Sequence, residues 1–380
     1  MSKSKDNHLH IISFDIPIPT NYGGAIDIFY KIKALHEKGI KIHLHCFQYG
    51  VRKKEARLLD YCEEVHYYKR KSFAQSITAN FPYIINSRKD EKLLERLSAK
   101  KFPILFEGLH SCFYLTHPQL KYRMKIVRTH NIEHDYYANL AKTEKNYIKK
   151  LYYLNEAKAL ADFEKKLKYA DGVAVISKND HKYFSEKFKN VFTVSAFHPN
   201  ESVDILQGKG DYVLYHGSLE VNENHHAAMY LVNNVFRGMD FKLVIAGNKP
   251  KQELIKAAAG VSNVEIRAGL SVEQIYKLVR EAHVNILPTF QATGIKLKLL
   301  LALYQGRHCL VNTPMIINTG LQELCHIADD TKSFKEQLSR LFEIEMNQDE
   351  IDHRKSVLLD NGFMNFWNAD LLIKKMFAKK

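Results

Sequence analysis

The sequence predicts an α/β protein built from two doubly wound parallel-sheet domains. Short, mostly apolar segments alternate with longer segments of helical spacing along most of the 380-residue chain. A polar stretch at residues 196–212, which contains Pro199, Gly208 and Gly210, interrupts this alternation. The length suits two or three domains of about 150 residues each. We therefore expect an N-terminal domain over residues 1–200 and a second domain over residues 211–360.

Five strand segments are expected in each domain, each followed by a helical segment or a turn-rich loop. In open parallel sheets, ligands bind beyond the carboxyl ends of the strands, so the loops directly after these segments are the candidate sites. The first five segments are "LHIISFDI", "IKIHLHCF", "PILFEG", "KIVRTHN" and "GVAVIS", and the second five are "YVLYHGS", "FKLVIAGN", "NVEIRAG", "HVNILPTF" and "HCLVNT".

The composition limits the class of protein. The chain is 46% hydrophobic and 26% charged, as is usual for a globular protein with sizeable cores. It has no apolar run of about 18 residues, and its polar start does not resemble a signal peptide. Its five cysteines are widely spaced and form no CxxC pair, so neither a disulfide framework nor a zinc site is expected. A reducing cytoplasm is the expected compartment.

The charge balance favours anionic partners. The chain carries 56 basic and 42 acidic side chains, a net charge of +14. Such a charge attracts nucleotides, phospholipid headgroups or acidic polymers. Because no zinc-finger spacing or RNA-recognition aromatic signature is present, nucleic acid is not an expected partner.

The loop after the first strand contains the dipeptide Gly23–Gly24 directly before a helical segment. Two glycines let the backbone approach a ligand, and a helix N-terminus offers free N–H groups to a phosphate or a sugar hydroxyl. The pattern is not GxGxxG, so it does not support dinucleotide binding. A plain turn is the alternative explanation.

A second candidate loop, "VRTHNIEHDYY", follows the fourth strand. It gathers Arg128, His130, Asn131 and Glu133, which are costly to bury without partners. We expect this loop to face a cleft, with His130 able to donate hydrogen bonds or move a proton. The spacing HNIEH is not the HExxH of zinc enzymes, so no metal is expected.

Two further loops lie in the second domain. Gly217 and Ser218 follow its first strand, a usual place for a nucleotide phosphate. In "ATGIKLKLLLALYQG", Thr293 and Gly294 are expected to form a turn before a helix whose N-terminus carries positive potential. Lys298, or failing it Lys296, would add a full charge beside a diphosphate. Solvated lysines at a helix start are the alternative.

The order of these features resembles GT-B glycosyltransferases, in particular the bacterial enzymes similar to family 4, the glycosyl transferases group 1. The matching stretches cover most of residues 8–312. They are, in chain order, "PIPTNYGGAIDIFYKIKALHEKGIKIHLHCF", "RTHNIEHDYY", "YADGVAVISKNDHKYF", "YHGSLEVNENHHAAMYLV", "FKLVIAGNKP" and "LPTFQATGIKLKLLLALYQG".

The resemblance implies two Rossmann-like domains with a cleft between them, an acceptor on the first domain and a nucleotide-sugar donor on the second. A final helix at residues 362–380 would complete the first domain. His130 resembles a histidine held beside the transferred sugar, which makes it the catalytic candidate. Arg128, Asn131 and Glu133 would lie on the acceptor side. The expected donor-binding residues are Gly24, Gly217, Ser218, Thr293, Gly294, Lys296 and Lys298.

The sequence departs from the family pattern in its last motif. Many relatives carry two glutamates eight residues apart, where this chain has Thr293 and Leu301. The second glutamate commonly binds the nucleotide ribose, and a leucine cannot accept that hydrogen bond. The Arg/Lys pair that many relatives carry in the first loop of the second domain is also absent.

We therefore expect a metal-independent glycosyltransferase without a bound cofactor, which moves a sugar from a nucleotide-diphosphate sugar to a glycan or lipid-linked acceptor in bacterial surface polysaccharide synthesis. Net retention of configuration is implied by the resemblance alone. One alternative is a nucleotide-sugar 2-epimerase with Glu107, Glu133 or Glu220 as acid or base. Another is a non-catalytic partner subunit of the same fold, for which Leu301 argues.

An association with the inner face of an anionic membrane is a further expectation. Residues 67–73, "YYKRKSF", interleave aromatic and basic side chains, and "KTEKNYIKKLYY" and "FEKKLKYA" add lysines in the same domain. Each well-placed basic residue contributes about 1 kcal/mol toward binding anionic lipid. The alternative is an ordinary solvated lysine-rich surface.

Overall fold

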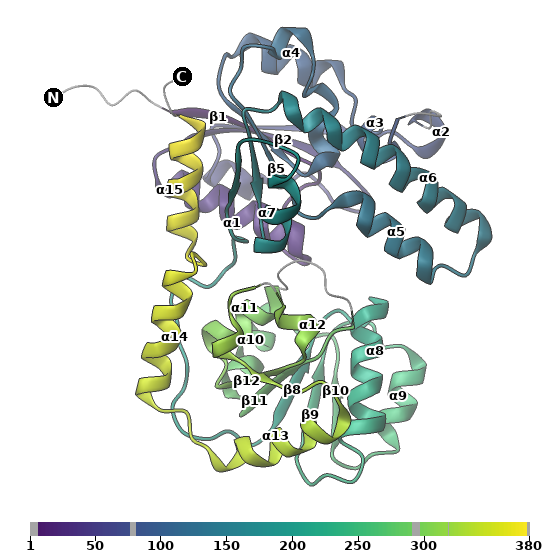
Figure 1. Ribbon diagram of the computed structural model, residues 1–380, viewed down its shortest axis with the longest axis vertical. Helices are drawn as coiled ribbons and strands as arrows, with labels where there is room; N and C mark the ends of the chain where they lie inside the picture. The colour runs from purple at the N-terminus through teal and green to yellow at the C-terminus, as the bar shows by residue number, and fades with distance from the viewer. Residues whose placement is uncertain (1–6, 77–80, 291–296, 318, 378–380) are drawn as a thin grey trace, which may run out of the picture. The chain divides into compact units, whose positions relative to one another are not determined.

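The computed structural model describes residues 7–76, 81–290, 297–317 and 319–377. The chain divides into two compact units (Figure 1). The first unit runs to Pro199 and includes the residues from Phe363 onward, and the second unit is Asn200–Gly362.

The first unit is built on a parallel sheet of seven strands in the order β3-β2-β1-β4-β5-β6-β7. The order runs outward in both directions from β1 and β4, so the sheet is doubly wound and its topological switch point lies between these two strands. The strands are β1 His8–Ser13, β2 Lys41–Gln48, β3 Glu64–Lys69, β4 Ile104–Glu107, β5 Lys125–Arg128, β6 Gly172–Val175 and β7 Val191–Thr193.

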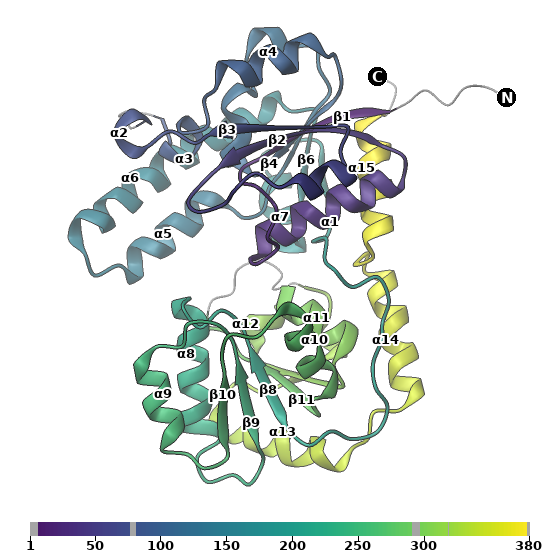
Figure 2. The same cartoon turned by 180° about the vertical axis from the view of Figure 1, so that it is seen from behind.

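Helices cover both faces of this sheet. One core contains apolar side chains of α1 and α15, which lie side by side in Figure 2. The other core contains side chains of α3, α4, α6 and α7. The helices are α1 Gly23–Glu37, α2 Phe73–Ser76, α3 Tyr83–Asn86, α4 Glu91–Ala99, α5 Glu133–Thr143, α6 Tyr147–Glu164, α7 Lys178–Ser185 and α15 Asn365–Met376.

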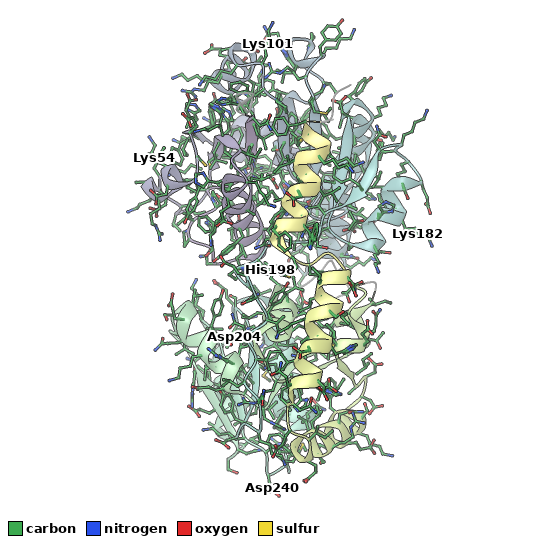
Figure 3. All side chains as sticks on the ribbon, turned by 90° about the vertical axis from the view of Figure 1, so that its left-hand side faces the viewer. Lys54, Lys101, Lys182, His198, Asp204 and Asp240 are labelled. Carbon is green, nitrogen blue, oxygen red and sulfur yellow. The ribbon has the colours of Figure 1, made fainter. Side chains whose placement is uncertain are left out.

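The last helix is tied to the first unit by hydrogen bonds as well as by apolar packing. His198 contacts the carbonyl oxygen of Phe363 through Nε2 at 2.7 Å, beside the start of α15 (Figure 3). The Asn365 side chain accepts from the N–H of His198 at 3.1 Å and donates to its carbonyl at 2.7 Å. These hydrogen bonds and the apolar packing against α1 join the C-terminal segment to the first unit.

The second unit repeats the same architecture with a six-stranded parallel sheet in the order β10-β9-β8-β11-β12-β13. Its switch point lies between β8 and β11, so the loops after these two strands are placed to hold a ligand. The strands are β8 Val213–His216, β9 Leu243–Ala246, β10 Val264–Arg267, β11 Val284–Leu287, β12 His308–Val311 and β13 His326–Ile327.

In the second unit, α10 and α11 pack on one side of the sheet, and α8 and α9 lie on the other side (Figures 1 and 2). Here α10 carries a Ser271 capping box with Gln274, which pairs free N–H groups at its start. The helices are α8 Asn222–Tyr230, α9 Gln252–Ala259, α10 Val272–Glu281, α11 Leu297–Gln305, α12 Thr313–Ile316, α13 Thr331–Glu343 and α14 Gln348–Asp360.

The predicted fold class, two doubly wound α/β sheets, is confirmed, and each of the ten expected segments contains a strand. Three strands were not predicted: β3, β7 and β13. The latter two are only three and two residues long. Strand β3, "EVHYYK", is mostly half-buried and polar because it lies at the sheet edge, so it lacks the apolar run that marks a central strand.

Candidate functional site

The carboxyl edge of the first sheet holds a buried network of charges centred on Lys31. Lys31 and Asp27 lie one turn apart on α1, and the Lys31 ammonium donates to Asp27 Oδ2 at 2.9 Å. The same ammonium lies 2.7 Å from both carboxylate oxygens of Glu107, the last residue of β4. Lys31 and Glu107 have no exposed surface, so these charges interact in a medium of low dielectric.

Arg128, at the end of β5, completes this network from the other side of Asp27. Its Nη2 and Nε lie 2.8 and 3.2 Å from the two Asp27 carboxylate oxygens. Nη1 and Nη2 also donate to the carbonyl oxygens of Val194 and Ser195 at 2.9 and 3.0 Å. The guanidinium is fully buried, so Arg128 does not face a cleft as predicted. Its contribution to an acceptor site would be indirect, through the position of Asp27.

Both carboxylates in the network are held in their charged form. Burial alone would raise the pKa of Asp27, but the neighbouring Arg128 and Lys31 charges outweigh it and hold this pKa well below its usual range. Burial likewise opposes ionisation of Glu107, whereas Lys31 and His130 lower its pKa. With two acidic and two basic side chains, the network is close to neutral.

His130 lies at the exposed end of this network. Its Nε2 lies 3.0 Å from Glu107 Oε2, and its side chain is 11% exposed. Because the carboxylate of Glu107 only accepts, Nε2 must carry the proton, and in the neutral imidazole Nδ1 is then the lone-pair nitrogen. Glu107 thus fixes both the orientation and the tautomer of His130. Phe14, from the loop after β1, packs edge-on against the ring with 5.3 Å between centroids.

Asp27, Glu107 and His130 together have the donor atoms of a metal site, with ligand atoms within 4.8 Å of one another. Carboxylate and imidazole groups are ordinary ligands for divalent cations. Here, however, the Lys31 ammonium already lies within 2.9 Å of both carboxylates. A divalent ion would have to displace this lysine, so the donor set is organised around an internal ammonium.

Gly24 is the second residue of α1 and packs against the same aromatic ring that borders His130. A Cβ atom at this position would lie 2.8 Å from Cζ of Phe14. The start of α1 has no side-chain hydrogen bond from its cap residue, Tyr22. Such a helix start can present backbone N–H groups to an anion. The predicted role of Gly24 in donor binding stays a prediction.

The other two predicted acceptor-side residues follow His130 in the chain. Asn131 is half-buried, and Glu133 is the first residue of α5 and only 4% exposed. Burial raises the pKa of Glu133 to about 8 against the opposing effect of Arg88. Its Oε1 has no hydrogen-bond partner among the described residues and lies 3.7 Å from His110 Nδ1. Glu133 is therefore mostly protonated at neutral pH.

In the second unit, Lys298 reaches from α11 to the start of α8. Its ammonium donates to Asn224 Oδ1 at 2.9 Å and to the Tyr215 hydroxyl at 3.4 Å. It also lies 5.0 Å from the centroid of the Tyr215 ring, which is fully buried below it. Lys298 is half-buried and oriented by these contacts, unlike a lysine extended into solvent.

Asn224 joins this lysine to the predicted loop after β8. Its side-chain amide donates to the carbonyl oxygen of Ser218 at 3.0 Å. A Cβ atom on Gly217 would lie 3.0 Å from the same amide, and a Cβ atom on Gly247 would lie 1.9 Å from the Gly217 carbonyl oxygen. The loop can therefore take this path only with glycine at these positions. The structure brings Gly217, Ser218 and Lys298 together, as expected of a single site.

His216, the last residue of β8, lies buried beside Lys298. Burial, together with the smaller effect of the Lys298 charge, lowers its pKa to about 3. His216 is thus a neutral imidazole, and its Nε2 has no hydrogen-bond partner within the described chain. In the loop after the neighbouring strand β11, the Thr289 hydroxyl donates to Glu223, which lies in the first turn of α8.

Three predicted donor-binding residues, Thr293, Gly294 and Lys296, lie outside the described residues. Their roles therefore stay predictions. The described part of this motif begins at Leu297 with α11, whose segment Leu299–Tyr304 is buried.

Leu301 stands where the resemblance implies a ribose-binding glutamate in many relatives, and it lies in the core of the second unit. It is 8% exposed and belongs to an apolar cluster with residues of β8, β9 and α10. We expect Leu301→Glu to lower the free energy of unfolding by about 3 kcal/mol or more, because a carboxylate would be buried without a partner. Urea denaturation checks this, with the volume-conserving Leu301→Met, expected within about 1.5 kcal/mol, as control. A stable Leu301→Glu protein with tighter nucleotide binding would contradict it.

Several residues of both candidate sites were not singled out from the sequence. They are Asp27, Lys31, Tyr215 and Asn224. A signal was available for the first two, since a polar pair at spacing i, i+4 lies beside Ile28 and Ile32 on an otherwise apolar helix face. Asn224 and Tyr215 have no such signal, because their role depends on a lysine far along the chain.

Comparison with known proteins agrees with this architecture. Residues 210–343 match the family model described as glycosyl transferases group 1. An uncharacterized 44.6 kDa protein in the cps region of Klebsiella pneumoniae is 25% identical over 329 residues, which is 82% of each chain. Sucrose-phosphate synthase from Thermosynechococcus elongatus is similar in structure, with a TM-score of 0.67 at 13% identity over 98% of this chain and 99% of its own. A glycosyltransferase from Rickettsia africae is also similar in structure, with a TM-score of 0.65 at 11% identity over 99% of this chain and 100% of its own.

Proposed function

We propose that this chain, a glycosyltransferase of the GT-B fold with a group 1 domain at residues 210–343, transfers a sugar from a nucleotide-diphosphate sugar to a glycan or lipid-linked acceptor. The second unit would bind the donor, and the first unit would bind the acceptor. Net retention of configuration and independence of metal ions belong to the same proposal.

The observation that carries the proposal is the arrangement around Lys298. A half-buried ammonium lies next to a glycine-containing loop, at the carboxyl edge of a doubly wound sheet and beside its switch point. This is where such sheets hold nucleotide phosphates. When the sugar leaves, negative charge develops on the diphosphate, and a fixed ammonium stabilises that charge without reorganising.

His130 supplies the second element of the mechanism from the first unit. Its Nε2 proton is held by Glu107, which leaves Nδ1 to accept a hydrogen bond from a sugar hydroxyl. We propose that His130 orients the transferred sugar in this way. The buried charges behind it keep the imidazole in one position, and such fixed positioning is a main source of rate acceleration.

The donor site is tested with Lys298→Ala. Loss of one charge-assisted contact costs about 1.5–3 kcal/mol, so we expect nucleoside-diphosphate affinity to fall about 10- to 100-fold while the fold persists. A thermal-shift panel of nucleoside diphosphates identifies the base, since a ligand at about 100 times its dissociation constant stabilises the folded protein by about 2.7 kcal/mol. Calorimetric titration of that nucleotide then compares variant and wild type.

The matched control is Lys256→Ala, which removes an exposed lysine from α9 of the same unit. It changes the net charge equally and should leave the affinity unchanged. If Lys298→Ala binds the nucleotide as tightly as Lys256→Ala does, Lys298 is not part of the donor site. If no nucleoside diphosphate binds the wild-type chain, the proposed donor class is wrong.

A role in surface polysaccharide synthesis is supported by the relative from a cps region, the designation of a capsule locus. We propose a cytoplasmic enzyme that associates peripherally with the inner face of a membrane, as a lipid-linked acceptor would require. No helix among the described residues is long and apolar enough to cross a membrane. We propose that contact with lipid relies on surface charge, so it should be salt-sensitive.

The structure does not favour the epimerase alternative, which needs acid and base carboxylates near one sugar. Glu107 is ion-paired with Lys31 and fully buried, and Glu133 lies buried with a raised pKa. Glu220 belongs to the other unit, where its carboxylate is paired with Lys249 at 2.9 Å on the surface.

A further inference from the structure

A cavity of about 480 Å³ lies at the carboxyl edge of the first sheet, apart from the His130 network. Its walls come from the residues that follow β2, from the segment that follows β3, and from the start of α3. Three consecutive basic residues, Lys69, Arg70 and Lys71, line it together with Tyr49 and Tyr83. The proposed function uses none of these side chains.

Arg70 is fixed in place at this cavity. Its guanidinium lies 4.4 Å from the ring centroid of Tyr49 and 5.0 Å from that of Tyr83. Its Nε donates to Ser87 Oγ at 2.9 Å, and the backbone N–H of Lys71 donates to the Ser87 carbonyl at 2.9 Å. Stacking and one hydrogen bond orient the guanidinium, which leaves its two terminal nitrogens as a fork that matches a phosphate or carboxylate group.

The cavity carries positive charge that no acidic side chain in its wall offsets. Among the described residues, none of the lining side chains is Asp or Glu, and no ion pair joins Lys69, Arg70 or Lys71 to a carboxylate. Glu156 is an acidic residue whose charge interacts with that of Arg70. Its carboxylate accepts hydrogen bonds from the backbone N–H groups of Tyr83 and Ile84 at 3.0 and 2.9 Å. An adjoining hollow shares Lys69 and Lys71 but also contains Asp90 and Glu91.

The position of the cavity separates it from the reacting atoms. It follows strands β2 and β3, whereas His130 follows β5, three to four strands away in the same parallel sheet. At about 4.8 Å between neighbouring strands, an anion in the cavity would lie about 15–20 Å from His130. That distance corresponds to several sugar rings, so an anion bound here belongs to a remote part of the acceptor.

We propose that the cavity around Arg70 binds a phosphate or diphosphate group of the acceptor, remote from the hydroxyl that receives the sugar. Three cationic groups suit a multiply charged phosphate better than a single carboxylate, and the volume exceeds that of one phosphate. That the ligand is the acceptor rests on the proposed function, whereas the anion site itself rests on the residues that line the cavity. The proposal gives the basic residues of segment 67–73 a role in a cavity and not in a flat membrane-binding surface. Tyr68 is buried in β3, so it is not available to such a surface.

The test uses the full chain and inorganic pyrophosphate as probe. Lys69→Ala/Lys71→Ala removes two cavity charges and leaves Arg70, which contacts Ser87, in place. Lys101→Ala/Lys121→Ala is the matched control, because both lysines are exposed in the first unit and line neither hollow. Calorimetry should show pyrophosphate binding weakened about tenfold or more by the cavity variant only.

Measurements in the Lys298→Ala background separate this site from the donor site. The proposal stands if pyrophosphate still binds the Lys298→Ala variant and the added cavity substitutions weaken that binding about tenfold or more, whatever their effect on nucleotide affinity. It is overturned if the cavity and control variants bind pyrophosphate equally. It is also overturned if the cavity lysines are needed for binding vesicles of phosphatidylglycerol while pyrophosphate neither binds nor competes, because the segment would then serve a membrane surface.

A second ligand distinguishes the two sources of such a phosphate. Farnesyl diphosphate that binds more tightly than pyrophosphate, with the gain lost in the cavity variant, indicates a lipid-linked diphosphate. Equal affinity for both ligands indicates a phosphate within the glycan. Both results support the anion site. Failure of the cavity substitutions to change the affinity for either ligand contradicts it.

Discussion

His130→Ala is expected to lower the rate of sugar transfer by about 100-fold or more while the affinity for the nucleotide changes less than twofold. The imidazole is oriented by Glu107 at 3.0 Å and lies at the exposed end of a buried charge network in the first unit. Because we propose that the nucleotide binds to the second unit, its binding should not depend on this side chain. Steady-state kinetics and calorimetric titration of the nucleotide measure the two effects separately.

The control for this substitution is His36→Ala, which removes an exposed imidazole from the last turn of α1. It should leave both quantities unchanged. His130→Gln is informative as well, because its amide can still donate to Glu107 and hold the position of the network while it lacks a ring nitrogen. If His130→Ala reduces binding and turnover equally, or changes neither, the assignment of His130 to the reacting sugar is wrong.

Asp27→Ala is expected to lower the free energy of unfolding of the first unit by about 3–5 kcal/mol. Asp27 has two charged partners, since Lys31 lies at 2.9 Å and Arg128 at 2.8 Å. Removal of the carboxylate leaves two buried cations to share Glu107 and frees the N–H of Phe197, which now donates to Asp27 at 2.8 Å. Urea denaturation of the full chain, followed by circular dichroism, measures the loss.

The matched control is Asp162→Ala. Its partner Lys165 lies at 2.8 Å, but both side chains are more than 60% exposed, so the loss should stay within about 1 kcal/mol. The two units can unfold separately, so the transitions must be resolved before free energies are compared. Equal stability of the Asp27 and Asp162 variants would show that the buried network does not hold the first unit together.

The loop after β5 differs from its prediction in the environment of each polar residue. Its polar residues predicted a loop that faces a cleft, but the structure shows different environments for neighbours. Arg128 is fully buried in ion pairs, Glu133 is buried with a raised pKa, and His130 retains some exposure. The residue types show that these groups are costly to bury, but the sequence does not show which partners offset that cost. The partners come from α1 and β4, many residues away.

The sequence by itself determined the two parallel sheets, the segments that form their central strands and the loops in which ligand-binding residues should be sought. These features depend on apolar runs and turns that are local in the chain, and so they can be read without any knowledge of contacts. The short strands β7 and β13 and the edge strand β3 were missed because their local pattern is weak.

Only the tertiary structure decided which charged groups meet. Lys31 and Glu107 are 76 positions apart, Asp27 and Arg128 are 101 apart, and Lys298 and Asn224 are 74 apart. Parallel strands return their carboxyl ends to one edge of the sheet, so residues distant in sequence become neighbours there. Whether a lysine at that edge is a solvated charge, a buried counter-ion or a phosphate ligand depends on the groups brought beside it, because burial and pairing set the energy of a charge.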